Sequence, residues 1–553
     1  MMNELKILFV NLTSNTSDMY VASAPPLGLY RIKNYLASKD IICDIVDLDL
    51  DGNLESKYLQ MVEQGKYDVI GISVSHHNMI TDLQTLWKFR NASKKSKKKC
   101  LFISGGQEAT LNYQQWLEAG IDIIILGFAE KPLYELILRM KNSDGDLNNI
   151  KASIKDIEGI AYKTQDGSFI YNSSTILTPL EWRELSFNQI LQLSLPYKDY
   201  WNVMYKDAGN LNFHGNKFIV ETVRLYTTSH CPQNCGFCSS QSFIPCSQKK
   251  ISKIFMLSAD EVFKLIQYHI RKYGAKGFLF SDDDLPVGNR EGLNRISDLC
   301  RLIINAKNND LIPKETIFNC QARITDFIMR ESGQKKINSK LIALLAQARF
   351  HGIGLGVETF SSRLLKCPSI NKIGINEEDC CNVLDAILQD GLIPTINIII
   401  GIPEITCDEI INTMRVAVKY LQKGCQVAVT TYMLAFPGAP IYNSSSYHIH
   451  TNEWINPETK KKLLITDYII PNDPTMADML SKVKDATYKE IQKIKKENPW
   501  LEVAMPKSLT GLIIFVSVAK LLGRRDVAEE FLSVAHQIIQ EEAIQNVEVR
   551  SCN

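Results

Sequence analysis

The chain has 553 residues and a formal net charge of +1; 45% of its residues are hydrophobic and 22% are charged. This balance is typical of a globular protein of two to four domains, and it gives no electrostatic reason to expect nucleic acid as a partner. The longest late apolar stretch, residues 511–523, is too short to span a membrane, and the first residues predict a strand, so we expect no secretory leader. Because its fourteen cysteines fit reduced thiols, we expect a cytoplasmic protein without membrane contact.

The first 145 residues alternate short apolar strands with helices. The expected strands cover residues 5–12, 42–49, 67–75, 100–106 and 122–128, and the expected helices cover residues 27–39 and 131–141. The first helix begins directly behind Pro25 and Pro26, and proline is a common start signal for a helix. This alternation predicts an α/β fold with a doubly wound, Rossmann-like parallel sheet. Such sheets bind ligands at the carboxyl ends of their strands.

Residues 146–216 read as a connecting segment with one β-hairpin over residues 159–172. A second alternation of strands and helices follows in residues 217–445. Its six expected strands cover residues 219–228, 277–284, 316–323, 351–359, 394–403 and 426–434. Six units predict a (β/α)6 partial barrel, because the closed barrel of this kind has eight. Residues 446–553 are expected to form a C-terminal α-helical region.

Three cysteines lie together in the loop behind the first expected barrel strand: Cys231, Cys235 and Cys238. Their thiols would lie at the carboxyl end of that strand, where the catalytic groups of barrels collect. Thiolates in a reducing compartment bind iron–sulfur clusters or zinc, and a closed site of either kind uses four ligands. Three leave one position open. A zinc site completed by His230 or Cys246, and three thiols without a metal, are the alternatives.

The spacing C-x3-C-x2-C, with the aromatic Phe237 before the last cysteine, resembles the signature of the radical S-adenosylmethionine (SAM) superfamily. The resemblance implies that the cysteines hold a [4Fe–4S] cluster, whose fourth iron is chelated by the amino and carboxylate groups of SAM. An electron from the cluster would then cleave the sulfonium to give a 5′-deoxyadenosyl radical, which no side chain can supply. The open position would be the place where SAM binds.

The resemblance continues along the expected barrel, with the motifs in the right order. It implies that Phe237 and five polar residues at strand ends contact SAM: Asp282, Asp283, Arg323, Glu358 and Thr359. The segments IIIGIPEIT and FPGAPIY resemble later motifs, although Ala439 replaces the usual threonine. Taken alone, the aspartates would be more simply interpreted as a turn or a helix cap. The ordered series of motifs favours contact with the cofactor.

Several segments of the first domain resemble the cobalamin-binding domain that precedes many radical SAM cores. The residues that carry this resemblance are Ser73, Ser75, Ser104, Gly105 and Gly106. It implies that they enclose the nucleotide tail of cobalamin, because glycine lets the backbone close on a ligand and serine leaves room for it. The segment GFAEKPLYEL departs from the family's pattern at Phe128 and Ala129. A vestigial sheet that binds no cobalamin is therefore the alternative.

Other cobalamin proteins supply a histidine to cobalt from a D-x-H-x-x-G motif, which this chain lacks. His76 and His77 are the histidines that precede residue 150, and neither follows an aspartate by two positions. We interpret both as polar loop residues, and we expect the chain to provide no strong nitrogen ligand to cobalt.

The two resemblances together imply a cobalamin-dependent radical SAM enzyme. We expect a methyltransferase that acts on an unactivated carbon, or on phosphorus, of a peptide, natural product or other small metabolite. Its partners would be that substrate and an external electron donor such as flavodoxin or ferredoxin. A cyclase, oxidoreductase or rearrangement enzyme of the same architecture is one alternative, and a non-catalytic metal-binding regulatory protein is another. A methylthiotransferase is disfavoured, because the first domain offers only Cys43 and Cys100 where a second cysteine triplet is needed.

Overall fold

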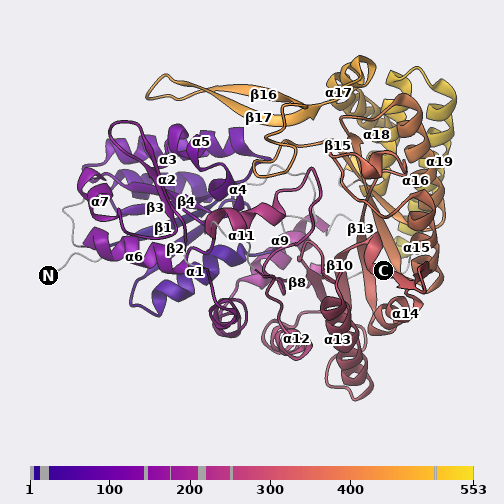
Figure 1. The fold of residues 1–553 in the computed structure, drawn as a ribbon, viewed down its shortest axis with the longest axis horizontal. Helices are drawn as coiled ribbons and strands as arrows, with labels where there is room; N and C mark the ends of the chain where they lie inside the picture. The colour runs from indigo at the N-terminus through magenta and orange to yellow at the C-terminus, as the bar shows by residue number, and fades with distance from the viewer. Residues whose placement is uncertain are drawn as a thin grey trace.

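The computed structural model shows an α/β molecule with two parallel sheets side by side and a helical layer at the C-terminal end (Figure 1). The structure describes residues 5–12, 24–141, 147–174, 176–208, 220–248, 253–502, 505 and 507–551. The expected fold class is confirmed. The expected domain boundaries at residues 145/146 and 216/217 lie outside the described residues.

The N-terminal sheet has seven strands in the order β2-β1-β3-β4-β5-β6-β7. Five are parallel: β1 (Ile7–Asn11), β2 (Cys43–Asp47), β3 (Val69–Ser73), β4 (Leu101–Gly105) and β5 (Ile123–Ile125). The expected hairpin forms β6 (Ile160–Lys163) and β7 (Phe169–Asn172), and it extends this same sheet by antiparallel pairing with β5. The sheet is therefore doubly wound, with a mixed edge.

Helices cover both faces of the N-terminal sheet, which explains why its parallel strands are apolar along their whole length. The first face carries α1 (Leu27–Ala37), α6 (Glu130–Lys141) and α7 (Leu147–Ser153). The second face carries α2 (Leu54–Glu63), α3 (Met79–Lys95), α4 (Gln107–Leu111) and α5 (Tyr113–Ala119). Beyond β7, the connecting segment contains α8 (Pro179–Arg183), the π-helical turn η1 (Glu184–Asn188), the 3₁₀ turn η2 (Ile190–Gln192) and α9 (Tyr197–Ala208).

The second sheet has six parallel strands in the order β15-β14-β13-β10-β9-β8, as expected for a partial barrel. The strands are β8 (Thr222–Leu225), β9 (Gly277–Phe280), β10 (Ile317–Arg323), β13 (Phe350–Glu358), β14 (Ile393–Gly401) and β15 (Gln426–Tyr432). The helices are α11 (Ser240–Gln248), α12 (Ala259–Tyr273), α13 (Arg290–Asn308), α14 (Ser339–Ala348), α15 (Glu377–Gln389) and α16 (Cys407–Gln422). A small antiparallel pair, β11 (Ile328–Glu331) and β12 (Gln334–Ile337), follows the 3₁₀ turn η3 (Ile324–Phe327), and a further turn, η4 (Leu364–Lys366), follows β13.

Phenylalanine rings hold the middle strands of this sheet together. The rings of Phe278 and Phe350 each lie within 6 Å of another ring of the group, with Phe318 5.6 Å from Phe278 and 5.4 Å from Phe350. Phe280 lies 5.9 Å from Phe350. All four side chains are buried, so β9, β10 and β13 form a rigid base beneath their carboxyl ends.

The expected helical region does not begin at residue 446. Two antiparallel strands, β16 (His448–Ile455) and β17 (Lys462–Ile470), precede the helices α17 (Pro474–Glu497), α18 (Lys507–Leu521) and α19 (Arg525–Ser551) and the turn η5 (Pro499–Glu502). The expectation was wrong for this stretch because its lysine-rich middle conceals two runs of β-branched and aromatic residues. Asn456 closes the turn by accepting hydrogen bonds from the backbone of Glu458 and Thr459.

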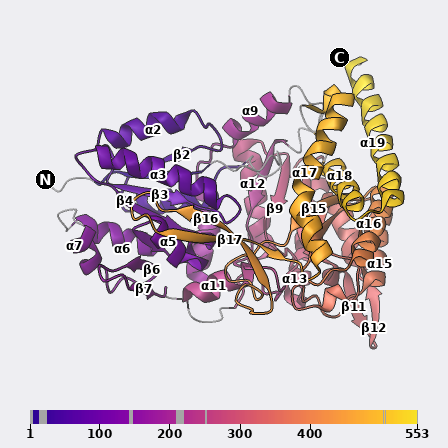
Figure 2. The same ribbon diagram turned by 90° about the horizontal axis from the view of Figure 1, so that it is seen from above.

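This hairpin, which we call the strap (residues 448–470), reaches back across the N-terminal domain (Figure 2). Leu463 and Ile465 are buried in that domain's core, and the Trp454 ring lies 6.4 Å from the Trp87 ring. Gln115 Nε2 donates to Leu464 O at 2.6 Å. The strap therefore connects the C-terminal part of the chain to the N-terminal sheet.

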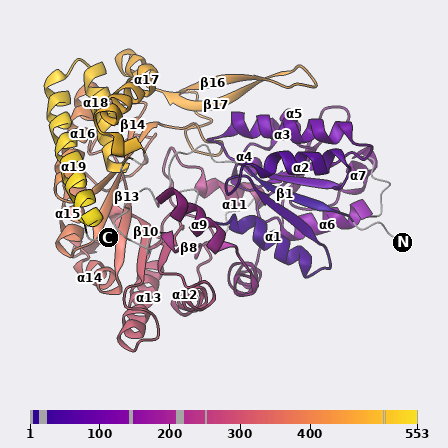
Figure 3. The same cartoon turned by 180° about the vertical axis from the view of Figure 1, so that it is seen from behind.

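α17 and α18 cover the β15 edge of the barrel, and α19 packs outside them on α18 and α16 (Figure 3). α18 approaches β15 closely at Gly511, where a Cβ atom would lie 3.0 Å from the side chain of Val429. Within the described ranges, no helix combines the length and the apolar character that crossing a bilayer requires.

Candidate active site

The cysteine loop, residues 229–239, follows β8 at the carboxyl end of the barrel and is clamped from two sides. Gly236 N donates to Ile370 O at 3.2 Å, and Ile441 N donates to Gly236 O at 3.1 Å. A Cβ atom on Gly236 would lie 1.9 Å from Pro368 O, which is far inside van der Waals contact. Only glycine lets the loop approach this neighbouring backbone.

The three cysteine thiols are partly buried, and burial raises the pKa of each. Lys372 and Arg323 act against this effect at Cys235, and Cys238 Sγ accepts a hydrogen bond from Ser240 N at 3.5 Å. Without a metal the thiols are therefore neutral, and iron must displace their protons when it binds.

The donor set fits an iron–sulfur cube better than a single ion. No three His, Cys, Asp or Glu side chains converge on one ion position in the part of the chain that the structure describes. A cube takes one thiolate per iron atom, so its ligands need not meet at a point, whereas zinc needs four ligands around one centre. Of the alternative zinc ligands, His230 shares a hydrogen bond with Ser229, and Cys246 is exposed at the far end of α11.

Asp282 and Asp283, both expected to contact SAM, have different surroundings. Asp282 is buried and accepts four hydrogen bonds, from the backbone N–H and the hydroxyl of both Thr227 and Thr228, at 2.6 to 2.9 Å. It ties β9 to the start of the cysteine loop. Asp283 is exposed, and Ser240 beside Cys238 donates a hydrogen bond to it. Of the two, Asp283 is the carboxylate that a ligand can reach.

Arg323 ends β10 beside two buried carboxyl groups that the sequence analysis did not single out, those of Asp284 and Asp326. Asp326 Oδ2 accepts from Arg323 N at 2.6 Å. Burial and mutual repulsion raise the pKa of Asp326 well above its usual range, and burial raises that of Asp284. Both carboxyl groups are therefore harder to ionise than a free aspartate, while the Arg323 guanidinium beside them favours their negative charge. Gln233 of the cysteine loop donates to Val287 O, in the turn that follows Asp284.

Glu358 and Thr359 point in opposite directions. Glu358 has a φ of 64°, which is uncommon for a residue other than glycine, and its carboxylate pairs with Lys372 at 2.7 Å. Thr359 is fully buried, and its hydroxyl lies 3.0 Å from that of Thr413 on α16. The structure therefore does not bring Thr359 to the site. Lys372 was missed because nothing in its local sequence links it to a strand end fourteen residues earlier.

Charged groups from three strands thus surround the cysteine loop. The pKa of Cys235 responds to Lys372, Arg323 and Glu358, and that of Cys238 responds to Asp283 and Glu358. Phe237 is partly buried and packs against the barrel core. Except for Thr359 and the fully engaged Asp282, the residues expected at SAM lie around one mouth of the barrel.

The candidate cobalamin residues lie at the ends of β3 and β4. Ser104 is buried and its hydroxyl donates to Ile72 O at 2.8 Å, while Ser75 N donates to Asp82 Oδ2 at 2.8 Å. Gly106 has a φ of 90° and no atom within 4 Å of where its Cβ would be. Ser73 ends β3 and pairs in register with Gly105. The two strand ends thus offer small side chains and open space.

His76 and His77 face the barrel. The ring centroids of His76 and His77 lie 5.0 and 5.2 Å from that of Phe436, which belongs to the segment FPGAPIY behind β15. His76 Nδ1 lies 3.3 Å from Glu108 Oε2, and both side chains are buried. Glu108 also accepts from Trp116 Nε1 at 3.1 Å. Both histidines therefore belong to the contact between the two domains.

The ends of the two sheets meet at the cysteine loop. Gln107 Nε2, one residue beyond Gly106, donates to Ser239 Oγ at 3.0 Å, one residue beyond Cys238. α11, which begins at Ser240, packs on α4 of the N-terminal domain. The two predicted ligand sites therefore share a border.

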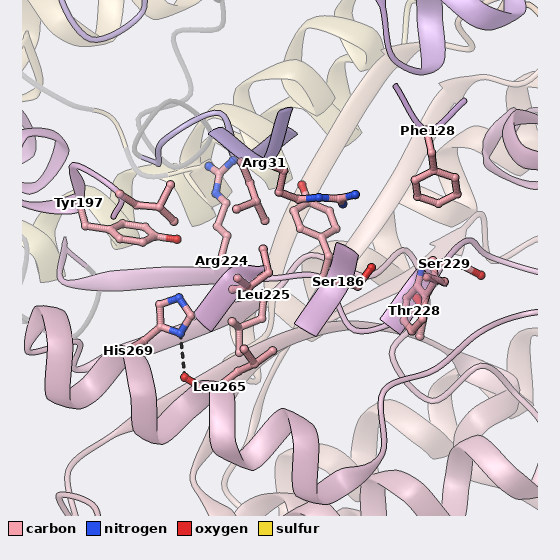
Figure 4. A pocket seen from close by; sticks show the side chains of 15 residues that line it. Arg31, Phe128, Ser186, Tyr197, Arg224, Leu225, Thr228, Ser229, Leu265 and His269 are labelled. Carbon is pink, nitrogen blue, oxygen red and sulfur yellow. Dashed lines mark hydrogen bonds between the residues drawn. The ribbon is translucent and has the colours of Figure 1, made fainter. Parts of the chain in front are cut away.

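A cavity of about 140 Å³ lies between α1, the connecting segment and β8 (Figure 4). It reaches Ser229, two residues before the first cysteine. Arg31 at its wall is oriented by Glu130 at 2.6 Å. His269 is buried beside Leu265 O, and burial lowers its pKa to about 4, so its ring is neutral. No motif in the sequence indicates a cavity at this place.

Family models match two parts of the chain: the B12 binding domain matches residues 20–137, and the radical SAM superfamily matches residues 225–417. The first match contains the ends of β3 and β4, and the second contains the cysteine loop, Arg323 and Glu358. A search of curated proteins found no match.

Solved structures share the whole architecture. The cobalamin-dependent S-adenosylmethionine radical enzyme OxsB, with aqua-cobalamin bound, aligns with a TM-score of 0.62 and 15% identity over 99% of this chain and 81% of its own. The radical S-adenosylmethionine methyltransferase TsrM from Kitasatospora setae, with cobalamin and a [4Fe-4S] cluster bound, aligns with a TM-score of 0.59 and 12% identity over 96% of this chain and 100% of its own. At these identities the likeness shows a common fold.

Proposed function

Because the chain belongs to the radical SAM enzymes that carry a B12 binding domain, we propose that it is a methyltransferase that acts on an unactivated carbon, or on phosphorus, of a small molecule. The two domains imply three cofactors: a [4Fe–4S] cluster, SAM and cobalamin. When bound, the cluster and SAM supply a carbon radical, and cobalamin supplies the methyl group.

The observation that carries the proposal is the hydrogen bond between Gln107 and Ser239. Gln107 follows the Gly105-Gly106 pair, and Ser239 follows Cys238, so the ends of the two sheets are in direct contact. Methyl transfer requires the methyl donor, the radical source and the substrate within bonding reach of one another. A chain in which the two cofactor ends meet supports such a reaction.

We assign Asp283, Arg323 and Glu358 to the polar groups of SAM. Asp283 and Glu358 accept hydrogen bonds, and a guanidinium can hold a carboxylate through two parallel hydrogen bonds. The protein fixes Glu358 beforehand through Lys372, and the backbone N–H of Arg323 is held by Asp326 Oδ2. Asp282 instead holds the cysteine loop in place.

We assign the ends of β3 and β4 to the nucleotide tail of cobalamin. Gly106 leaves open space and Ser73 is small, and a residue other than glycine could adopt the φ of 90° at position 106 only at a cost. His76 is engaged with Glu108 and packs on Phe436, which agrees with a chain that gives cobalt no strong nitrogen ligand.

Radical SAM enzymes act on small-molecule substrates and need a reductant. For this chain we propose a peptide, natural product or other small metabolite as substrate and flavodoxin or ferredoxin as the electron donor. One solved structure of TsrM contains tryptophan as substrate and a SAM analogue. Tryptophan is the substrate in that structure of TsrM, so we choose aromatic metabolites as the first candidate substrates to test with this chain.

The test uses SAM with a deuterated methyl group. The reconstituted holoenzyme, with reduced flavodoxin, is incubated with pooled candidate substrates, and products are followed by mass spectrometry. A methyltransferase gives labelled product together with S-adenosylhomocysteine and, if a hydrogen atom is abstracted, 5′-deoxyadenosine. Protein reconstituted without cobalamin is the control and should give no labelled product. Deoxyadenosine with an altered but unlabelled product would instead identify a cyclase, oxidoreductase or rearrangement enzyme.

A further inference from the structure

Lys372 and Glu358 form an ion pair that is withdrawn from solvent. Their side chains are 5% and 9% exposed, and Nζ lies 2.7 Å from Oε1. Lys372 Nζ also donates to Gly356 O at 2.5 Å. A buried pair is weak grounds for a stabilising role, because the desolvation of both charges offsets their attraction. We therefore look for the function of this ion pair in the groups that it orients.

The backbone is shaped around this pair. The pairing of β13 with β14 shifts register between Gly356 and Glu358, and Glu358 adopts a φ of 64°. A Cβ atom on Gly356 would lie 2.6 Å from Lys372 Nζ and 2.7 Å from Glu358 Oε1. Residues other than glycine with such φ values are costly and concentrate at functional sites. The bulge and the glycine thus serve to seat the Glu358 carboxylate against Lys372.

The segment that carries Lys372 also clamps the cysteine loop. Asn371 Nδ2 donates to Asn234 O at 2.6 Å, and Ile370 O accepts from Gly236 N at 3.2 Å. These two residues directly precede Lys372. One short segment therefore fixes both the loop that carries the thiols and the carboxylate beside them.

We propose that Lys372 is a positioning residue that fixes Glu358 in the orientation that receives SAM and keeps a positive charge beside the cysteine loop that its neighbours Ile370 and Asn371 clamp. This inference rests on the proposed function, because it presupposes a cluster at the cysteines and SAM beside it. Lys372 touches neither in this proposal; it acts through Glu358 and through its charge. A cation near an iron–sulfur cluster favours the more negative, reduced form.

The experiment compares Lys372→Met and Lys372→Arg with wild type, all reconstituted anaerobically. Binding of labelled SAM is measured by equilibrium dialysis, and the reduction potential of the cluster by titration monitored with electron paramagnetic resonance. For Lys372→Met we expect iron retained, SAM affinity about 10- to 100-fold weaker, as for other second-layer partners of a metal site, and a lower potential. Lys372→Arg keeps the charge, so its SAM affinity and its reduction potential should lie between those of Lys372→Met and wild type.

A matched control is Lys307→Met. Lys307 is also a buried barrel lysine, but it donates to Thr316 O and Ala348 O, which precede β10 and β13 at the opposite end of the strands. Its loss should lower thermal stability without changing the SAM affinity of the folded protein. If Lys372→Met also unfolds, thermal melting of the apo protein reveals it, and Lys372→Arg then carries the comparison.

A double-mutant cycle with Glu358→Gln completes the test. If Lys372 acts through Glu358, the double variant should bind SAM no more weakly than the worse single variant. Unchanged SAM affinity and potential in Lys372→Met, or losses that multiply in the double variant, would overturn the inference. If the wild-type protein itself binds no iron or no SAM, it is the proposed function that fails.

Discussion

At the mouth of the barrel, Glu358 is held by Lys372 and Asp282 by Thr227 and Thr228, whereas at the end of the N-terminal sheet Gly106 has no neighbour within 4 Å of its missing side chain. The barrel end is built from charged groups, of which Glu358 and Asp282 are fixed by partners in the protein. The sheet end is built from small residues and space.

The difference matches what each end is proposed to receive. SAM is compact and carries an amino group, a carboxylate and a sulfonium, so it is recognised by charges held in place before binding. Cobalamin is large, and a site for its tail needs room more than charge. Substitutions should therefore act differently at the two ends. At the barrel, loss of a partner residue should weaken SAM binding, and at the sheet, a larger side chain should weaken cobalamin binding.

The largest effect should follow the loss of a cluster ligand. Changing Cys231, Cys235 or Cys238 to alanine leaves two thiolates, which fix a cluster poorly, so iron and SAM cleavage should fall to background. Anaerobic reconstitution with iron analysis and assay of 5′-deoxyadenosine measures both. Cys246→Ala is the matched control, since this thiol is exposed in α11 and should leave both unchanged. Loss of metal from the Cys246 variant would instead support the zinc alternative.

A strong effect on the cysteine loop should also come from Gly236→Ala, which removes no ligand. The new Cβ would lie 1.9 Å from Pro368 O. Both atoms are fixed by the backbone, so rotation of a side chain cannot relieve the clash. We expect unfolding free energy to fall by about 3 kcal/mol, with iron retention reduced. Chemical denaturation checks the first and iron analysis the second. Gly28→Ala, at an α1 position with nothing within 4 Å, should be neutral or stabilising. Equal stability of the two variants would speak against the clamped loop.

The unfolding free energy should depend on pH through Asp82, a carboxyl group near the end of the N-terminal sheet that is buried without a positively charged partner among the described residues. Burial raises the pKa of Asp82 to about 7, while Ser75 lowers it only in part. The folded protein therefore holds a proton that the unfolded chain releases near pH 4, so unfolding free energy should fall as pH rises from about 4 to about 7, by at most about 1.4 kcal/mol per pH unit. Asp82→Asn should flatten this part of the curve. Identical pH profiles for the variant and wild type would contradict it.

The smallest effect on stability, and the most selective on function, is expected for Gly106→Ala. Gly167, in the turn between β6 and β7, has the same φ of 90° and lies away from the candidate cobalamin residues. Both substitutions should cost about 1 kcal/mol of unfolding free energy. Only Gly106→Ala should weaken cobalamin binding, measured by spectroscopic titration. Equal cobalamin affinity in both variants would remove Gly106 from the proposed site.

The sequence predicted what depends on local pattern. Runs of isoleucine and valine gave the strands of both sheets, and the spacing of Cys231, Cys235 and Cys238 gave the cluster loop. The sequence also predicted that Asp283, Arg323 and Glu358 lie close together at one end of the barrel, because parallel strands end on the same side of a sheet.

Contacts between segments far apart in sequence could not be predicted. Nothing near Lys372 indicates that it pairs with Glu358, and the pairing of Asp284 with Asp326 depends on two different loops. The strap was read as helix because its lysines outweigh the β-branched residues around them. The burial of Thr359 against Thr413 likewise depends on how α16 packs, which no single motif records.

The central proposal is that one chain holds a cluster at its barrel and cobalamin at its sheet, with the two sites side by side. Its most direct test is the content of iron, zinc and cobalamin per chain after anaerobic reconstitution of wild type, the triple cysteine-to-alanine variant and Gly106→Ala. We predict about four irons with stoichiometric cobalamin in wild type, cobalamin without iron in the cysteine variant, and iron with weakened cobalamin binding in Gly106→Ala. Zinc without iron, or wild-type protein that binds no cobalamin, would contradict the account.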